Sequence, residues 1–156
     1  MARNPAKSID MAKKKAQEVN FSLQLLNIEL LEFSLTRPTK PVEENEPVNF
    51  QVGMEQRFDQ ANKLAFVATT ITIIDGTEEA NALAKIVTSC NFRIENLEDF
   101  TNTKTGKVLL PDPAITTLNA VSISTTRGIL FSELRGTHLH GAVLPVMDPS
   151  NFQKVN

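Results

Sequence analysis

Several residue types and patterns are scarce in this sequence of 156 residues, and each absence narrows the class of protein. A single cysteine, Cys90, excludes an intramolecular disulfide and fits a reducing compartment. No apolar run approaches the roughly 18–20 residues that span a bilayer. The basic N-terminal stretch is not followed by the continuous apolar segment of a secretory signal. We therefore expect a soluble protein of the cytoplasm.

An excess of charge of one sign is also missing. Sixteen Lys and Arg against eighteen Asp and Glu give a net charge of −2, so the whole chain has no electrostatic footprint for nucleic acid. Basic side chains gather only within residues 1–19, which include three consecutive lysines. We expect this stretch to be a flexible arm, either solvated or docked on a partner. A single domain over 20–152 and a tail over 153–156 complete the expected organisation.

Side chains that carry catalysis are equally few. His138 and His140 would point the same way from a strand and make half of a metal site, with Cys90 or a distant carboxylate as a further ligand. The simpler alternative is two surface histidines on an edge segment. The KTGK stretch at 104–107 lacks the first glycine and the final Ser or Thr of a phosphate loop. We expect no enzyme, no metal site and no cofactor.

Apolar residues with a period of two begin at Phe21 and indicate a strand over 20–37. Two adjacent pairs, Leu25–Leu26 and Leu30–Leu31, each shift the apolar face by one residue. An inserted residue of this kind is typical of a β-bulge, which bends and twists its strand. The sequence therefore predicts one long, bent strand.

Three more strands are predicted, over 48–54, 63–74 and 80–94. Turn chemistry at 59–62 and at Asp75-Gly76 separates them, and short connections favour an antiparallel meander of four strands.

The period then changes to that of a helix. Asp112 before Pro113 is typical of an N-cap followed by proline at the first helical position, and Gly136 lies where a C-terminal glycine cap belongs. Leu118 and Leu130 keep the helical spacing in between. The fold class expected is α+β, a bent four-stranded antiparallel sheet (a meander) followed by one long helix.

One helix cannot cover both faces of a four-stranded sheet, so self-association is the simplest way to hide the remaining apolar residues. A stripe of small residues on the helix would let another backbone approach closely. The candidate oligomer contact is therefore Thr125, Gly128 and Ser132.

Three segments of the chain contain a recognisable set of motifs. They are Ser124-x-x-Arg127-Gly128, Gly136-Thr137, Leu144-Pro145 and Pro149-x-x-Phe152 over 123–152, Phe21-x-Leu23-Gln24 and Leu31-x-Phe33 over 20–37, and the run over 78–94. These segments resemble the SecB-type protein-export chaperones. The stretch over 123–152 is similar to that family's C-terminal signature, and the strands over 20–37 and 78–94 are similar to its first and fourth strands.

This resemblance implies dimers that assemble into a tetramer and bind unfolded polypeptide without nucleotide. The proline-rich stretch after the first strand falls where the family has a crossover loop. Val48, Phe50 and Val52 match positions that line the family's client groove, and they alternate with polar residues. The alternative is that these three side chains simply pack the core.

Departures from the family pattern point to a particular branch. Leu30, Ser34 and Lys85 stand where export chaperones carry acidic residues on the outer sheet face, while Leu83 alone matches a position that contacts the translocation motor. The family would also continue past Asn156 into a lid helix and a tail that touches the motor. These differences count against motor docking by the usual surfaces and suit the dedicated chaperones of toxin–antitoxin systems.

The leading hypothesis is a chaperone for unfolded polypeptides, such as preproteins in transit to export. The alternatives are a chaperone dedicated to one partner, such as an antitoxin, and a non-catalytic structural subunit that buries the groove in a permanent complex.

Overall fold

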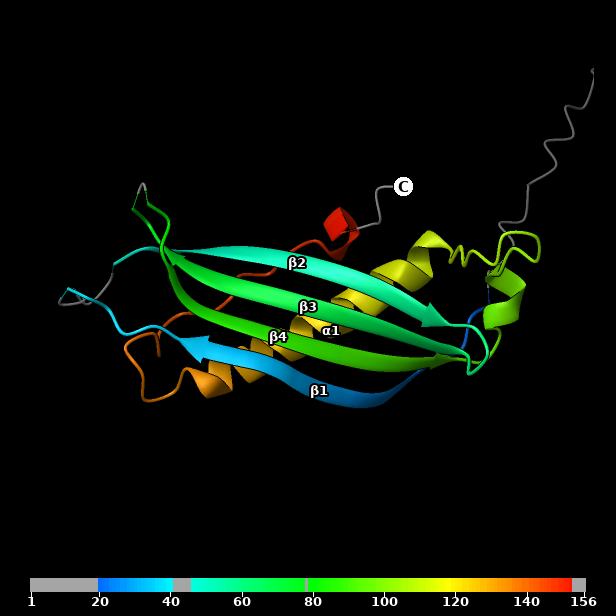
Figure 1. The fold of residues 1–156 in the computed structure, drawn as a ribbon, viewed down its shortest axis with the longest axis horizontal. Coiled ribbons are helices and arrows are strands. Elements are labelled where there is room, and N and C mark those ends of the chain that lie inside the picture. Colours follow the sequence, from blue (N-terminus) through cyan, green and yellow to red (C-terminus); the bar gives the residue numbers. More distant parts are fainter. Residues whose placement is uncertain (1–19, 41–45, 78, 153–156) are drawn as a thin grey trace, which may run out of the picture.

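The computed structural model describes residues 20–40, 46–77 and 79–152. The expected arm over 1–19 and tail over 153–156 lie outside these ranges. The described elements are β1 (Leu23–Leu35), β2 (Val48–Asp59), β3 (Leu64–Asp75), β4 (Ala82–Ile94), the 3-10 turn η1 (Leu97–Phe100), α1 (Asp112–Glu133) and the 3-10 turn η2 (Pro149–Phe152). Figure 1 shows one sheet with α1 behind it, which confirms the predicted α+β class. Among the helices of the described ranges, none has the length and hydrophobicity of a transmembrane span.

All strand pairs are antiparallel, but the order across the sheet is β1-β4-β3-β2. Strands β2, β3 and β4 form the expected meander, whereas the expectation that β1 lies next to β2 is wrong. The two strands instead lie at opposite edges of the sheet, joined by the 12-residue connection over 36–47, in keeping with the crossover loop implied by the resemblance. Three strand spacings amount to about 14 Å, which a connection of this length spans easily.

Two bulges in β1 confirm the interpretation of the paired leucines. The pairing with β4 shifts between Leu25 and Asn27 and again between Leu30 and Glu32, so Leu26 and Leu31 are the inserted residues. Because each insertion restores the apolar side chains to the same face, β1 presents one continuous apolar row to the helix side. The row consists of Leu23, Leu25, Ile28, Leu30, Phe33 and Leu35, each opposite a buried residue of β4.

Two prolines mark the residue at which helix α1 begins, and a glycine lies just after its end. The cap residue is Pro111, with Asp112 and Pro113 in the first turn, so the predicted cap at Asp112 is displaced by one residue. Gly136 has a φ of 76°, a left-handed conformation that glycine adopts without strain.

The core between sheet and helix contains two apolar clusters with a polar layer between them. The first cluster includes Val67, Cys90, Phe92, Ile94 and Leu118, and the second includes Ile71, Ile73, Ile86, Leu130 and Leu134. Along the same strands and helix, between the two clusters, lie the fully buried Thr69, Thr88, Ser122 and Thr126.

Helix α1 crosses the sheet diagonally, from behind β2 to below the end of β1 (Figure 1). Two opposite corners of the helix-side face are therefore left uncovered by the helix. We call them the β2 corner (Val48, Phe50 and Val52) and the β1 corner (Leu25, Ile28 and Leu30). The C-terminal segment, residues 135–152, runs past the β2 corner. The side chains of the β1 corner, in contrast, stay 39–46% exposed.

Candidate functional site

The β2 corner brings the three predicted groove residues onto one face. Phe50 and Val52 pair across the ladder with Ile73 and Ile71, which are fully buried on the helix side. Val48, Phe50 and Val52 are each half-buried and pack against the second cluster. Their side chains therefore belong partly to the core and leave part of their surface at the rim of the sheet.

The backbone of β2 is free along its outer side. β2 is an edge strand of 12 residues that pairs only with β3, and no other backbone hydrogen bond involves its residues within the described ranges. A row of unpaired N–H and C=O groups next to apolar side chains is suited to the addition of an extended strand.

The C-terminal segment reaches this corner because α1 holds it. Arg127 Nε donates to the carbonyl oxygen of Leu144 at 2.9 Å, and Arg127 Nη2 donates to that of Pro145 at 3.0 Å. The Arg-Gly and Leu-Pro parts of the sequence signature thus meet in space. Farther along, Met147 and Phe152 are half-buried against the same second cluster as the β2 corner.

Asn119 and Gln56 link β2, α1 and η2, and sequence reasoning missed both. Asn119 is fully buried, and its Oδ1 accepts a hydrogen bond from Gln56 Nε2 at 2.7 Å. Its Nδ2 donates to the carbonyl oxygens of Pro149 at 3.5 Å and Phe152 at 3.4 Å. The signal in the sequence was an asparagine directly after Leu118 on the apolar side of the predicted helix, where a buried amide needs partners.

Charges near the corner lie on the other face of β2 or at the surface. Arg57 and Glu55, on the outer face, form an exposed ion pair with each other at 2.9 Å. Asp148, just before η2, accepts hydrogen bonds from the hydroxyl and backbone N–H of Ser150, and these hold the pKa of the Asp148 carboxyl below its usual value. What the corner offers chemically is uncharged apolar contact plus backbone hydrogen bonding.

The predicted oligomer stripe is only partly turned away from the sheet, because the Thr125 side chain lies next to the buried Cys90 thiol. Thr125 is half-buried, Gly128 and Ser132 are exposed, and a Cβ added at Gly128 would meet nothing within 4 Å. The exposed ring of Phe131 follows on the same helix. The stripe is open to a partner, and its role as an oligomer contact stays a prediction.

The positions that the sequence analysis compared with the motor-binding surfaces of export chaperones do not all lie on one face of the sheet. Leu83 is half-buried against the second cluster, and Lys85 pairs on the outer face with Glu32 at 3.3 Å. Leu30, expected on the outer face, points to the helix side because the bulge at Leu26 shifts the alternation. The contact proposed for Leu83 stays a prediction.

His138 and His140 lie in turns after α1 and not on a strand, so the strand spacing that would have pointed both side chains the same way is absent here. His140 Nδ1 is 3.0 Å from the carbonyl oxygen of Thr137. Within the described ranges, no group of three or more His, Cys, Asp or Glu side chains is placed to hold a metal ion. Burial raises the pKa of the Cys90 thiol, which keeps it protonated near neutral pH.

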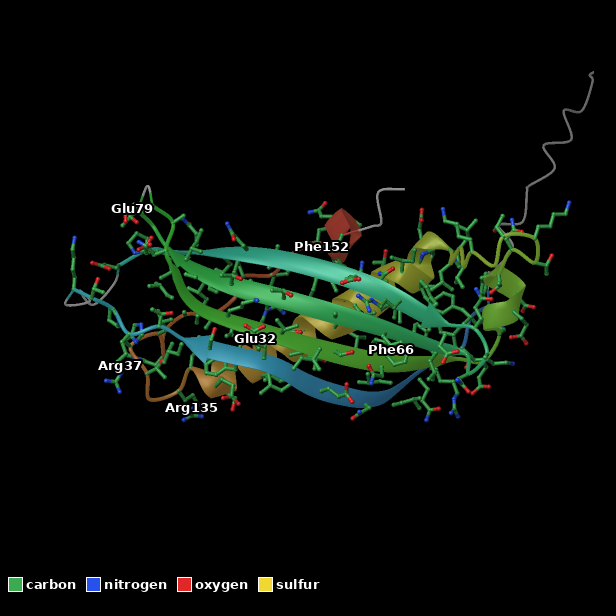
Figure 2. The ribbon with its side chains drawn as sticks, in the orientation of Figure 1. Glu32, Arg37, Phe66, Glu79, Arg135 and Phe152 are labelled. Carbon is green, nitrogen blue, oxygen red and sulfur yellow. The ribbon has the colours of Figure 1, made fainter. Side chains whose placement is uncertain are left out.

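A separate hollow of about 440 Å³ lies on the outer face of the sheet. Leu31, Phe66 and Ala68 line it together with Glu55, Arg57 and Ser89. Figure 2 shows Phe66 on this face, opposite α1. The Ser89 hydroxyl donates to Asn91 Oδ1 at 2.8 Å, and no histidine lines the hollow, so no nucleophile–base pair is assembled there.

Comparison with known proteins gives similarity of structure without similarity of sequence. No protein-family model matches the chain, and no curated protein matches it. A solved structure that does match is that of the SecB-like chaperone Rv1957 of Mycobacterium tuberculosis, in complex with a ChAD peptide from the antitoxin HigA1 (Rv1956). The TM-score is 0.53 at 13% sequence identity, over 80% of this chain and 89% of that chain. This chain has a SecB-like fold.

Proposed function

We propose that this protein is a cytoplasmic chaperone that binds unfolded or partly folded polypeptide at the β2 corner, without nucleotide or cofactor. The observation that carries the proposal is the combination of half-exposed apolar side chains and a free backbone edge on the same strand. The SecB-like fold supports it.

Binding at this corner would use β-strand addition. An extended segment hydrogen-bonds to the outer edge of β2, and every second side chain of the segment meets the row formed by Val48, Phe50 and Val52. Backbone hydrogen bonds do not depend on sequence, and apolar contact is tolerant of side-chain shape. The site therefore favours exposed apolar stretches of many sequences, which is what a folded client no longer offers.

A second candidate is a chaperone dedicated to one partner. It is supported by the antitoxin peptide held in the structure of Rv1957. In this version the client is the aggregation-prone tail of a single protein, such as an antitoxin. Docking to a translocation motor forms no part of this candidate, and on the outer face of the sheet Lys85 forms an ion pair with Glu32.

We also propose that the protein is a homo-oligomer, assembled as a dimer of dimers. Strand β1 supports one contact, because five of the nine large apolar side chains exposed in the described ranges lie on it, three of them in the β1 corner. A second copy is the partner best suited to cover an apolar strand edge on both faces. The stripe of Thr125, Gly128 and Ser132 is the proposed second contact.

Suppression of aggregation tests the general function. Light scattering of a chemically unfolded, unrelated protein is followed after dilution with and without this protein, using Phe50→Ser and, as matched control, Gln51→Ser. The Phe50 side chain faces the corner and the Gln51 side chain faces away from it. Loss of most of a phenylalanine contact is expected to weaken client binding about tenfold or more, while the control behaves as the parent.

The same experiment separates the two candidates. A folded oligomer that ignores the unrelated protein, yet keeps an antitoxin-type tail soluble, is a dedicated chaperone. Equal suppression by the Phe50→Ser variant and the parent would place client binding elsewhere on the molecule.

A further inference from the structure

We infer that the end of the C-terminal segment, from Met147 to Phe152, is an internal substitute for a client in the β2 corner and is displaced when a client binds. This inference rests on the proposed function and concerns the regulation of the same site. Figure 2 shows Phe152 on η2, beside β2. The half-buried Phe152 and Met147 pack against the second cluster, which also contacts Phe50 and Val52.

The C-terminal segment is held firmly in its first half. Leu139 and Leu144 are buried in the second cluster, and the guanidinium of Arg127 holds two consecutive carbonyl groups at 2.9 and 3.0 Å. A charged donor with two acceptors is among the stronger hydrogen-bonding arrangements in proteins. This half acts as a fixed anchor.

The second half of the segment is held weakly. η2 contains no buried residue, and the two hydrogen bonds from Asn119 to it are long, at 3.4 and 3.5 Å. Bonds of this length contribute less than those near 2.9 Å. Between the two halves, Val146 is 93% exposed, so little packing opposes a rotation of η2 away from α1.

The geometry also connects η2 to the strand that would receive the client. Gln56 on β2 donates to Asn119 Oδ1 and so fixes the amide with its Nδ2 facing the carbonyl groups of Pro149 and Phe152. A client that adds to β2 and reaches the second cluster competes with Met147 and Phe152, which pack against that cluster. The occupant of the site in the free protein is therefore part of the chain itself.

Competition of this kind lowers the apparent affinity by the fraction of molecules in the open state. Removing the Phe152 side chain should raise client affinity, whereas removing a wall of the groove should lower it. The direction of the change therefore decides between a displaceable occupant and a permanent part of the site.

The test is fluorescence anisotropy with a fluorescein-labelled peptide of alternating leucine and glutamine that matches β2 in length. The parent full-length chain is compared with Phe152→Ala, with Met147→Ala, and with Val146→Ala as the control from the same segment. We expect Phe152→Ala and Met147→Ala to bind the peptide at least about threefold more tightly, and Val146→Ala to bind as the parent does. Hydrogen exchange at 147–152 in the parent should become faster when the peptide is bound.

Two results would overturn the inference in different ways. In the first, the parent binds the peptide and Phe152→Ala binds it equally well or more weakly. Phe152 would then be a wall of the groove, and the proposed function would stand. Absence of peptide binding in the parent and in every variant would contradict the proposed function, and the inference would fall with it.

Discussion

Four buried hydroxyl side chains lie where the alternation of the strands and the spacing of the helix lead one to expect aliphatic residues. Thr88 and Thr126 form a hydrogen bond of 2.7 Å between sheet and helix, and Thr126 Oγ1 donates to the carbonyl oxygen of Ser122. Because the Thr126 proton is used there, the Thr88 hydroxyl is the donor between them. Within the described ranges, Thr69 Oγ1 has no hydrogen-bond partner.

The unpaired hydroxyl of Thr69 leads to a prediction about stability. Thr69→Val keeps the β-branched shape and removes a buried polar group, so we expect the free energy of unfolding to rise by about 1 kcal/mol. Thr70→Val, on the next residue and the opposite face, is the control and should change little. Urea denaturation of both variants measures the difference. A less stable Thr69→Val variant would mean that the hydroxyl is satisfied in solution, for example by a buried water.

Single elements were largely predictable because their signals are local. The bulges of β1 follow from two leucine pairs, and α1 follows from Pro113 at its start, Gly136 after its end and the apolar spacing between them. The order of the strands was not predictable in this way. Turn residues and loop lengths indicate which consecutive strands form hairpins. The pairing of β1 with β4 depends instead on contacts between residues far apart in the sequence.

The outward face of α1 carries a prediction at the scale of one element. Gly128→Leu should stabilise the helix by up to about 1 kcal/mol, since leucine favours helix over glycine and the position is open. The same change should dissociate any assembly that brings another backbone against Gly128. Sedimentation velocity together with thermal unfolding separates the two effects. An assembly of parental size would place the contact on another surface.

At the scale of the whole molecule, the diagonal path of α1 decides which apolar surface is left for other chains. The β2 corner faces part of its own chain, whereas the side chains of the β1 corner stay 39–46% exposed. Sequence alone placed Val48, Phe50 and Val52 on one face. It did not reveal Asn119 or the coverage by η2, because both depend on how the C-terminal segment returns across the sheet.

The β1 corner predicts where the oligomer forms. Ile28→Asp places a charge among the exposed apolar side chains of this corner and should shift the protein toward monomer. Asn27→Asp is the matched control, since Asn27 is the neighbouring residue on the opposite face. Light scattering coupled to size-exclusion chromatography gives the mass of each variant. Unchanged mass for Ile28→Asp would rule out this corner as a subunit contact.

The position of β1 in the sheet also affects the order of events during synthesis. Leu23 pairs with Ile94, so the first strand waits for roughly 70 more residues before its partner strand is complete. At about 5–20 residues per second, this apolar segment stays unpaired for several seconds on the ribosome. The hairpins of β2, β3 and β4 have local partners and can form earlier. During its own synthesis the protein thus exposes an extended apolar segment of the kind that we propose it binds.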